Sequence, residues 1–216
     1  MTTVYLIRHG TTDNNLNGLF QGSRDIPLGE LGILQSQQLA ERFKNIPLQA
    51  IYTSPLIRAQ QTAQILCKNH PHMSPILGNS LRELNGGLLE GHSGEENTSR
   101  FPQQMKYLDN QPTLFSAPGG ESTRQVYNRM IHAMRGIVDQ CPNQQIAVVS
   151  HGFTIQTYIG YVKQVPFDQL ERYIVGNTSV TCLQYDQNKI SLIYMSDMQH
   201  LPSNLQFYVA DNFLHK

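Results

Sequence analysis

Two short apolar segments, far apart in the sequence, each end in a histidine that is followed by a glycine. Residues 3–7 lead into Arg8 and His9, and residues 145–150 lead into His151. Short apolar runs with β-branched residues are typical of strands that are buried on both faces of a parallel sheet. Open α/β sheets bind their ligands at the carboxyl ends of such strands. We therefore expect both histidines at the same edge of one sheet.

The rest of the chain predicts helices and strands in alternation, with no linker or repeat that would mark a second domain. Helices are expected at residues 30–44, from Ser54 onward, at 101–108, from Ser122 onward and at 153–162. Further strands are expected at residues 50–53, 178–185 and 190–196, the last two joined as an edge hairpin. This alternation predicts an α/β fold, a three-layer α/β/α sandwich with a mainly parallel central sheet, formed by residues 1–216 as a single domain.

Two polar motifs predict where helices begin. Ser54 followed by Pro55 combines an N-cap residue with proline at the first helical position. Ser122 with Gln125 forms a capping box, and an apolar stripe follows it. Arg58 falls in the first turn after Ser54, where a cation opposes the helix dipole. Its side chain either extends into solvent or joins the helix N-terminus in binding an anion.

The composition gives no indication of a nucleic-acid or membrane partner. The chain has 16 lysines and arginines against 16 aspartates and glutamates, which gives no reason to expect nucleic acid or an anionic membrane surface. Its three cysteines are odd in number, so we expect no disulfide framework and a reducing, cytoplasmic location. The first apolar run is too short for a signal peptide or a membrane span. The oligomeric state is not indicated.

The basic residues at the predicted sheet edge suit a phosphate group. Guanidinium groups such as those of Arg8 and Arg58 bind phosphate oxygens bidentately. A neutral imidazole can attack phosphorus when a hydrogen bond holds its other ring nitrogen. The leaving alkoxide needs a proton, which a carboxyl group can supply. Glu83 and Glu90 lie in a glycine-rich segment and are both candidates, and their spacing does not choose between them.

Beyond these residues, the sequence resembles the histidine phosphatase (phosphoglycerate mutase-like) superfamily over roughly residues 4–180. The matching motifs follow the family's order: Arg8-His9-Gly10 with Thr12 and Asn15; Leu28, Gly32 and Gln35; Ser54-Pro55 to Ala63; Glu83 with Gly87, Glu90 and Gly91; Gly120-Glu121-Ser122; Ser150-His151-Gly152; and Gly176-Asn177-Thr178-Ser179. That number of ordered matches makes the resemblance specific.

The resemblance implies a role for each matching residue. His9 would be the nucleophile that becomes phosphorylated. Arg8, Arg58 and His151 would bind the phosphoryl group, and Asn15 would add a hydrogen bond. Glu83 would protonate the leaving group and then activate water, which leaves Glu90 as a framework residue. Gln21-Gly22 matches a loop that lies over the substrate, and the reaction would need neither a metal nor another cofactor.

The resemblance is closer to the phosphatase branch than to the mutase branch. In mutases a His-Tyr pair typically follows the acid glutamate, and a long insertion carries further arginines. Here Leu84-Asn85-Gly86 follows Glu83, and Arg100 is the only arginine between Glu83 and Gly120. The acid turn also lacks the aromatic residues of many phosphatases, so the pocket wall is expected to have a different shape.

We therefore expect a metal-independent phosphomonoester hydrolase that acts on a small phosphorylated metabolite through a phosphohistidine. The alternatives are a phosphoglycerate mutase, which would transfer the phosphoryl group between substrate hydroxyls, and a phosphate-binding sensor without activity.

Overall fold

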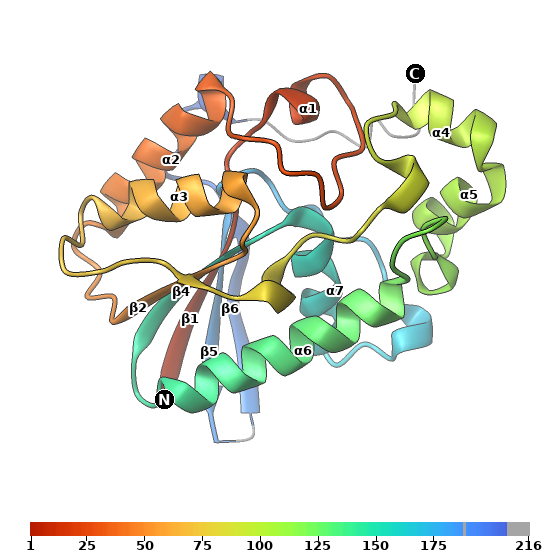
Figure 1. Ribbon diagram of the computed structural model, residues 1–216. Coiled ribbons are helices and arrows are strands. Elements are labelled where there is room, and N and C mark those ends of the chain that lie inside the picture. Colours follow the sequence, from red (N-terminus) through yellow and green to blue (C-terminus); the bar gives the residue numbers. More distant parts are fainter. Residues whose placement is uncertain (188, 207–216) are drawn as a thin grey trace.

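The computed structural model describes residues 1–187 and 189–206 (Figure 1). Its centre is a six-stranded sheet in the order β3-β2-β4-β1-β5-β6. The strands are β1 (Thr2–Arg8), β2 (Ala50–Thr53), β3 (Ile76–Leu77), β4 (Gln145–Ser150), β5 (Val180–Asp186) and β6 (Lys189–Asp197). Strands β3, β2, β4 and β1 are mutually parallel, whereas β5 is antiparallel to β1 and to β6. The predicted mainly parallel sheet with an edge hairpin is confirmed.

The helices of the described residues form the outer layers and a cover over the sheet's carboxyl edge. They are α1 (Asp13–Leu16), α2 (Glu30–Phe43), α3 (Ile57–Cys67), α4 (Gly94–Arg100), α5 (Pro102–Asn110), α6 (Thr123–Gln140) and α7 (Gly152–Val162). Helices α2 and α3 cover one face of the sheet, and α6 and α7 cover the other (Figure 1). This is the predicted three-layer α/β/α sandwich. None of the helices described is long and apolar enough to cross a membrane.

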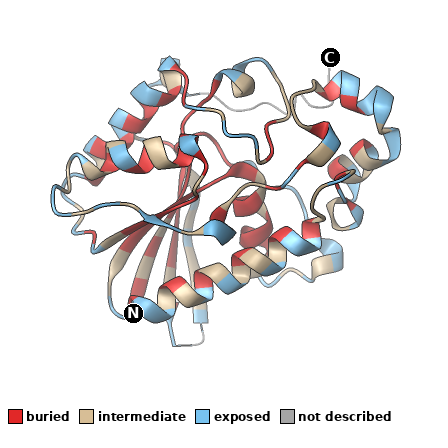
Figure 2. Cartoon of the chain, in the orientation of Figure 1, coloured by how far each residue is buried: buried red, intermediate tan, exposed pale blue. Residues whose placement is uncertain are grey.

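The alternation of side chains along the central strands explains why both faces need cover. Val4 and Leu6 of β1 pack in the cluster that includes α6 and α7. Ile7 packs in the cluster that includes Phe43 of α2 and Ala63 of α3. Successive strand residues point to opposite faces, so a continuous apolar strand is stable only between two helical layers. The central strands β1, β4 and β5 are accordingly mostly buried, whereas the short edge strand β3 is exposed (Figure 2).

A third apolar cluster lies beyond the sheet, between helix α5 and the first turn of α6. Its buried members include Leu84, Met105, Leu108 and Phe115. The helix expected at 101–108 is present as α5, whereas α4 was not predicted. The capping box that begins α4 is formed by Ser93 and Glu96.

The prediction that Ser54 and Pro55 begin a helix was wrong. Helix α3 begins at Ile57, with Leu56 as its N-cap residue. The Ser54 N–H donates to Val149 O at 3.0 Å, which keeps Ser54 extended beside β4. The predicted capping box of Ser122 is confirmed at the start of α6.

Candidate active site

His9 and His151 lie side by side at the carboxyl edge of the sheet. Strands β1 and β4 pair Arg8 with Ser150, so each histidine is the first residue after its strand. The two imidazole centroids are 5.1 Å apart, and the side chains are 2% and 0% exposed. The prediction of a shared edge is confirmed.

The hydrogen bonds of His9 define which ring nitrogen is available. His9 Nδ1 lies 2.6 Å from Gly10 O, and a carbonyl oxygen only accepts, so the proton is on Nδ1. Nε2 therefore keeps its lone pair, and Arg58 Nε donates to it at 3.3 Å. This is the tautomer in which Nε2 can act as a nucleophile.

Close backbone packing holds this turn in place. A Cβ atom on Gly10 would lie 2.5 Å from Gly32 O in helix α2. Gly10 N–H also donates to Thr62 Oγ1 of helix α3 at 3.1 Å. Both helices of one layer thus contact the residue whose carbonyl orients His9, which leaves no room for a side chain at Gly10.

Two arginines surround His9, and both are turned inward. Arg58 is 0% exposed and donates to Gly22 O and Arg24 O, each at 2.7 Å. This excludes the expectation that its side chain extends into solvent. Arg8 donates through Nη1 to Val175 O at 2.6 Å. Burial lowers the pKa of each guanidinium to about 10, so both remain positively charged at neutral pH.

The same surroundings keep both histidines neutral. Burial is the largest cause that lowers the pKa of His9 well below its usual value, and the charges of Arg58 and Arg8 add to it. Burial and the charge of Arg58 lower the pKa of His151 in the same way. Both imidazoles are therefore unprotonated near pH 7.

His151 makes its hydrogen bond through Nε2, whereas His9 bonds the backbone through Nδ1. His151 Nε2 lies 2.7 Å from Ser54 Oγ. Its Nδ1 is buried and has no hydrogen-bond partner among the described residues, and the same is true of Arg8 Nε. Buried polar atoms are normally paired, so these two atoms are suited to bind an anion in the site.

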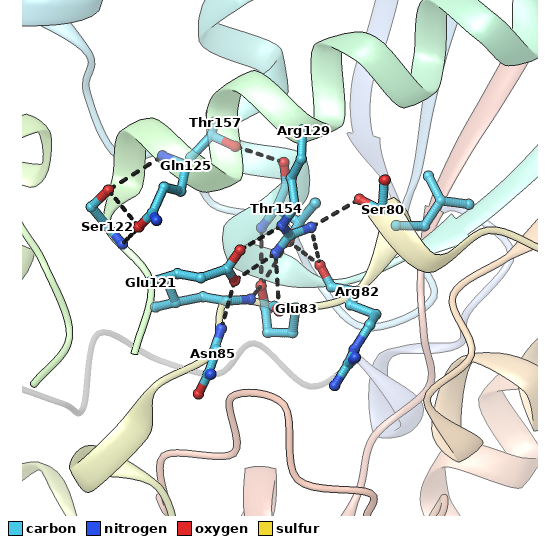
Figure 3. Close-up of polar contacts among 12 residues, drawn as sticks. Ser80, Arg82, Glu83, Asn85, Glu121, Ser122, Gln125, Arg129, Thr154 and Thr157 are labelled. Atoms are coloured by element: carbon cyan, nitrogen blue, oxygen red, sulfur yellow. Dashed lines mark hydrogen bonds and ion pairs between the residues drawn. The ribbon is translucent and has the colours of Figure 1, made fainter. Parts of the chain in front are cut away.

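Glu83 approaches the site from the loop before η2 (Gly87–Leu89). Its carboxylate accepts hydrogen bonds from Phe153 N at 3.0 Å and Thr154 N at 3.1 Å, which belong to the first turn of α7. Thr154 Oγ1 also donates to it (Figure 3). The free N–H groups of the first turn of α7 thus hold the Glu83 carboxyl group in place.

Glu90 has a different environment, as expected for a framework residue. Its Oε1 accepts from Ser23 N at 2.7 Å, Ser23 Oγ at 3.0 Å and Gly86 N at 2.8 Å. These bonds join the loop that carries Gln21 and Gly22 to the loop that carries Glu83, residues 82–86, which we call the acid loop. Glu83 lines the pocket and Glu90 does not.

A pocket of about 360 Å³ adjoins these groups, within the size range of small-molecule sites. We refer to Arg8, His9, Arg58 and His151 as the basic floor. We refer to six of the apolar side chains that line the rest of the pocket as the apolar wall: Leu19, Phe20, Leu84, Leu108, Phe153 and Ile174. Asn15, Gln21 and Gly22 also line the pocket. All the predicted binding residues therefore line it except His151, whose imidazole lies beside that of His9.

Asn15 is oriented by its neighbours. Its Oδ1 accepts from Thr12 N at 3.1 Å and from Asn177 Nδ2 at 3.4 Å. The amide nitrogen of Asn15 is therefore the atom left for a ligand. Asn177 Nδ2 also donates to His9 O at 3.0 Å, which connects Asn15 to the turn that carries His9.

The sequence did not indicate three residues of the site. Arg172 lines the pocket and pairs with Asp109 at 3.2 Å, but it lies in a polar segment without a motif. Thr154 binds Glu83 across 71 residues of chain, and no sequence pattern predicts that contact. Arg129 binds the backbone of the acid loop, and its only sequence signal is its place beside the apolar stripe of α6.

Among the described residues, no three His, Cys, Asp or Glu side chains lie close enough to hold a metal ion.

The comparison with known proteins identifies the family. The sequence profile described as "Histidine phosphatase superfamily (branch 1)" matches residues 4–198. The chain belongs to this superfamily. A member of the histidine phosphatase superfamily with this set of buried groups is an enzyme of the phosphatase and phosphoglycerate mutase-like type.

Its relatives within the superfamily differ in their named activities. The chain is 32% identical over 188 residues to a probable phosphoglycerate mutase GpmB from Cronobacter sakazakii, covering 87% of each chain. Among solved structures, Bacillus stearothermophilus YhfR has a TM-score of 0.86 at 32% identity, covering 93% of this chain and 99% of that one. A mutant phosphoserine phosphatase from Entamoeba histolytica in complex with phosphoserine has a TM-score of 0.81 at 29% identity, covering 94% and 100%.

Proposed function

We propose that the protein hydrolyses phosphomonoesters of small molecules through a phosphohistidine at His9, without a metal. The observation that carries this proposal is the state of His9. Its Nδ1 proton is held by Gly10 O, and its Nε2 lone pair accepts from the buried Arg58. A neutral, oriented imidazole beside two cations is suited to attack a phosphorus atom whose oxygens those cations bind.

In the first half of the reaction, His9 Nε2 attacks phosphorus and the ester P–O bond breaks. Arg8, Arg58 and His151 bind the phosphoryl oxygens, with Asn15 adding its amide N–H. If the Ser54 hydroxyl donates to His151 Nε2, the proton of His151 is on Nδ1, where it can donate to the phosphoryl group. Glu83 in its protonated form gives its proton to the leaving alkoxide.

In the second half, the Glu83 carboxylate takes a proton from water as the water oxygen attacks phosphorus. The P–N bond breaks, the electron pair returns to His9 Nε2, and inorganic phosphate leaves. Glu83 is again protonated and His9 is again neutral. The two half-reactions use the same groups, with water replacing the alcohol.

The shape and charge of the outer pocket favour water as the acceptor. A mutase must hold a substrate that bears a second acidic group, and this requires a further free cation in the pocket. Beyond Arg8 and Arg58, the only lysine or arginine that lines the described pocket is Arg172, which Asp109 neutralises at 3.2 Å. The apolar wall instead suits an ester with an apolar organic group.

The experiment is a comparison of substrates in the presence of a chelator. We expect release of inorganic phosphate from phenyl phosphate, undiminished by the chelator, and loss of this activity in His9→Ala. His132→Ala, at an exposed histidine of α6, is the matched control and should retain full activity. Interconversion of phosphoglycerates that depends on a bisphosphate primer, without release of phosphate, would instead establish the mutase.

A further inference from the structure

Arg129 of helix α6 is fully engaged in hydrogen bonds around the acid loop. Its Nη1 donates to Ser80 O at 2.8 Å and Arg82 O at 2.7 Å, and its Nη2 donates to Glu83 O at 3.0 Å. Its Nε and Nη2 also donate to the two carboxylate oxygens of Glu121, at 2.9 and 3.0 Å. A guanidinium has five N–H donors, and all of them are used here.

Glu121 holds the other side of the same loop. Its Oε2 accepts from Asn85 N at 2.8 Å, and its own N–H donates to Asn85 O at 2.8 Å. Burial would raise the pKa of the Glu121 carboxyl, but the hydrogen bonds from Arg129 and Asn85 outweigh it and lower that pKa. The pair is therefore ionised at neutral pH. The arginine and the glutamate together contact the backbone before, at and after Glu83 (Figure 3).

The loop has no regular secondary structure of its own, although Thr154 Oγ1 donates to Arg82 O at 2.8 Å and Gly86 N–H donates to Glu90 at 2.8 Å. Residues 82–86 lie between two short 3₁₀ helices, η1 (Asn79–Leu81) and η2, and belong to neither. The Arg129 and Glu121 side chains are 19% and 24% exposed, so water competes only partly for these bonds. A bidentate arginine–carboxylate pair that is mostly shielded fixes geometry better than an exposed ion pair does.

The two ends of Glu83 are thus held by different elements. Helix α7 binds the carboxylate through Phe153 and Thr154, whereas α6 holds the backbone through Arg129. Movement of the backbone would pull the carboxyl group away from the first turn of α7. A displacement of about 1 Å at such a group can reduce a rate by about 100-fold.

We propose that Arg129 and Glu121 are positioning residues, which place Glu83 for proton transfer to the leaving group. This inference rests on the proposed function, because Arg129 and Glu121 can position a general acid only if Glu83 is that acid. It predicts a defect that depends on the leaving group. An alkoxide needs the proton from Glu83, whereas a dinitrophenolate leaves without it.

The test measures kcat/KM for phosphate esters whose alcohols span a wide range of pKa. For Glu121→Gln and for Arg129→Lys, we expect a loss of about 10- to 100-fold on alkyl phosphates and of less than about threefold on 2,4-dinitrophenyl phosphate. Arg135→Lys is the matched control, since Arg135 is an exposed arginine of the same helix. It should match the wild type on every ester.

Equal losses on all esters, or no loss on any, would overturn the proposal. The double variant Arg129→Lys with Glu121→Gln should lose little more than either single variant, because the two residues act as one unit. If Arg129→Lys does not fold, Glu121→Gln, which keeps the size of the side chain, carries the same test alone.

Glu83→Gln on the same esters separates this inference from the proposed function. If Glu83→Gln shows no dependence on the leaving group, Glu83 is not the acid and the proposed mechanism fails. If Glu83→Gln shows the dependence but the Arg129 and Glu121 variants do not, only the positioning role fails.

Discussion

The basic floor and the apolar wall of the pocket are built in opposite ways. The four residues of the floor are at most 9% exposed. Arg8 is the last residue of β1, His9 and His151 directly follow β1 and β4, and Arg58 lies in the first turn of α3. The wall comes from loops and from the helices that cover the sheet's edge, and its members range from Leu84, 2% exposed, to Ile174, 60% exposed. The floor is thus fixed by sheet pairing, while the wall is not.

This difference separates chemistry from substrate choice. A group that follows a paired strand keeps its position when side chains elsewhere change, because backbone hydrogen bonds place it. A wall made by loops can change its shape without disturbing those bonds. In the proposed mechanism, substitutions in the floor should therefore reduce turnover on every ester, and substitutions in the wall should alter the preference among esters.

The largest effect is expected for His9→Ala. Removal of a covalent nucleophile typically lowers kcat by several orders of magnitude, about 10⁶-fold in one well-studied hydrolase. We expect loss on all esters, good and poor leaving groups alike, measured as release of inorganic phosphate. The fold should persist because the apolar core does not depend on His9. Residual turnover above 10% of wild type, with phosphate still bound, would remove His9 from the mechanism.

Arg58→Lys should have the next largest effect. Lysine keeps the charge but lacks the planar fork with which Arg58 donates to Gly22 O, Arg24 O and His9 Nε2 at the same time. We expect a loss in kcat of about 100-fold or more on every ester. Arg172→Lys is the comparison at the rim of the pocket, by which we mean the part lined by Arg172, whose side chain is 33% exposed. This substitution should change kcat by less than about threefold. Similar losses in both variants would erase the distinction between floor and rim.

A smaller, selective effect is expected in the wall. Ile174→Ser should raise KM for phenyl phosphate by up to about tenfold and leave kcat unchanged, since it removes uniform binding of the organic group. Methyl phosphate should be unaffected. Ile193→Ser is the control, because Ile193 is similarly exposed on β6 and does not line the pocket. A fall in kcat for Ile174→Ser would show that the wall affects the chemical step as well as substrate binding.

The smallest effect concerns the support behind the floor. His200 Nε2 lies 3.3 Å from Thr178 Oγ1, and Thr178 N–H donates to Arg8 O and His9 O. Burial and then the charge of Arg42 lower the pKa of His200 to about 4. Because the folded pKa is below the ordinary value, the stabilisation is complete above about pH 6.5 and is lost as the pH falls toward 4.

His200→Asn should therefore flatten the pH dependence of the free energy of unfolding in that window. The expected change in slope is at most about 1.4 kcal/mol per pH unit, and urea unfolding between pH 7 and 4 measures it. Activity at pH 7 should change by less than about twofold. An unchanged slope would show that His200 is protonated equally in the folded and unfolded chain.

The sequence predicted the floor better than the rest of the site, because the residues next to each histidine in the sequence are enough to place it. Each histidine of the floor directly follows an apolar run, so a short pattern is enough to place it. The choice of Glu83 over Glu90 came only from the family resemblance and stays a prediction, while in the structure Glu83 lines the pocket and Glu90 does not.

The errors arose where distant segments decide the local structure. Ser54 was expected to cap a helix, but its N–H pairs with Val149 and its hydroxyl meets His151. Arg129 and Arg172 act across 46 and 63 residues of chain on Glu83 and Asp109, respectively. Neither the hydrophobic pattern nor the secondary-structure propensity of a segment contains information about such distant contacts. The contacts of Arg129 with the acid loop and of Arg172 with Asp109 could therefore not be predicted.

The most direct test of the central claim is to trap the phosphoryl group on the enzyme. The protein is mixed with 2,4-dinitrophenyl phosphate, quenched with base within milliseconds and digested, and the phosphorylated peptide is identified by mass spectrometry. The mechanism predicts an alkali-stable, acid-labile phosphoryl group on His9, absent from His9→Ala and longer-lived in Glu83→Gln, where activation of water is lost. A phosphoryl group on another residue, or turnover with none on His9 at any time, would contradict it.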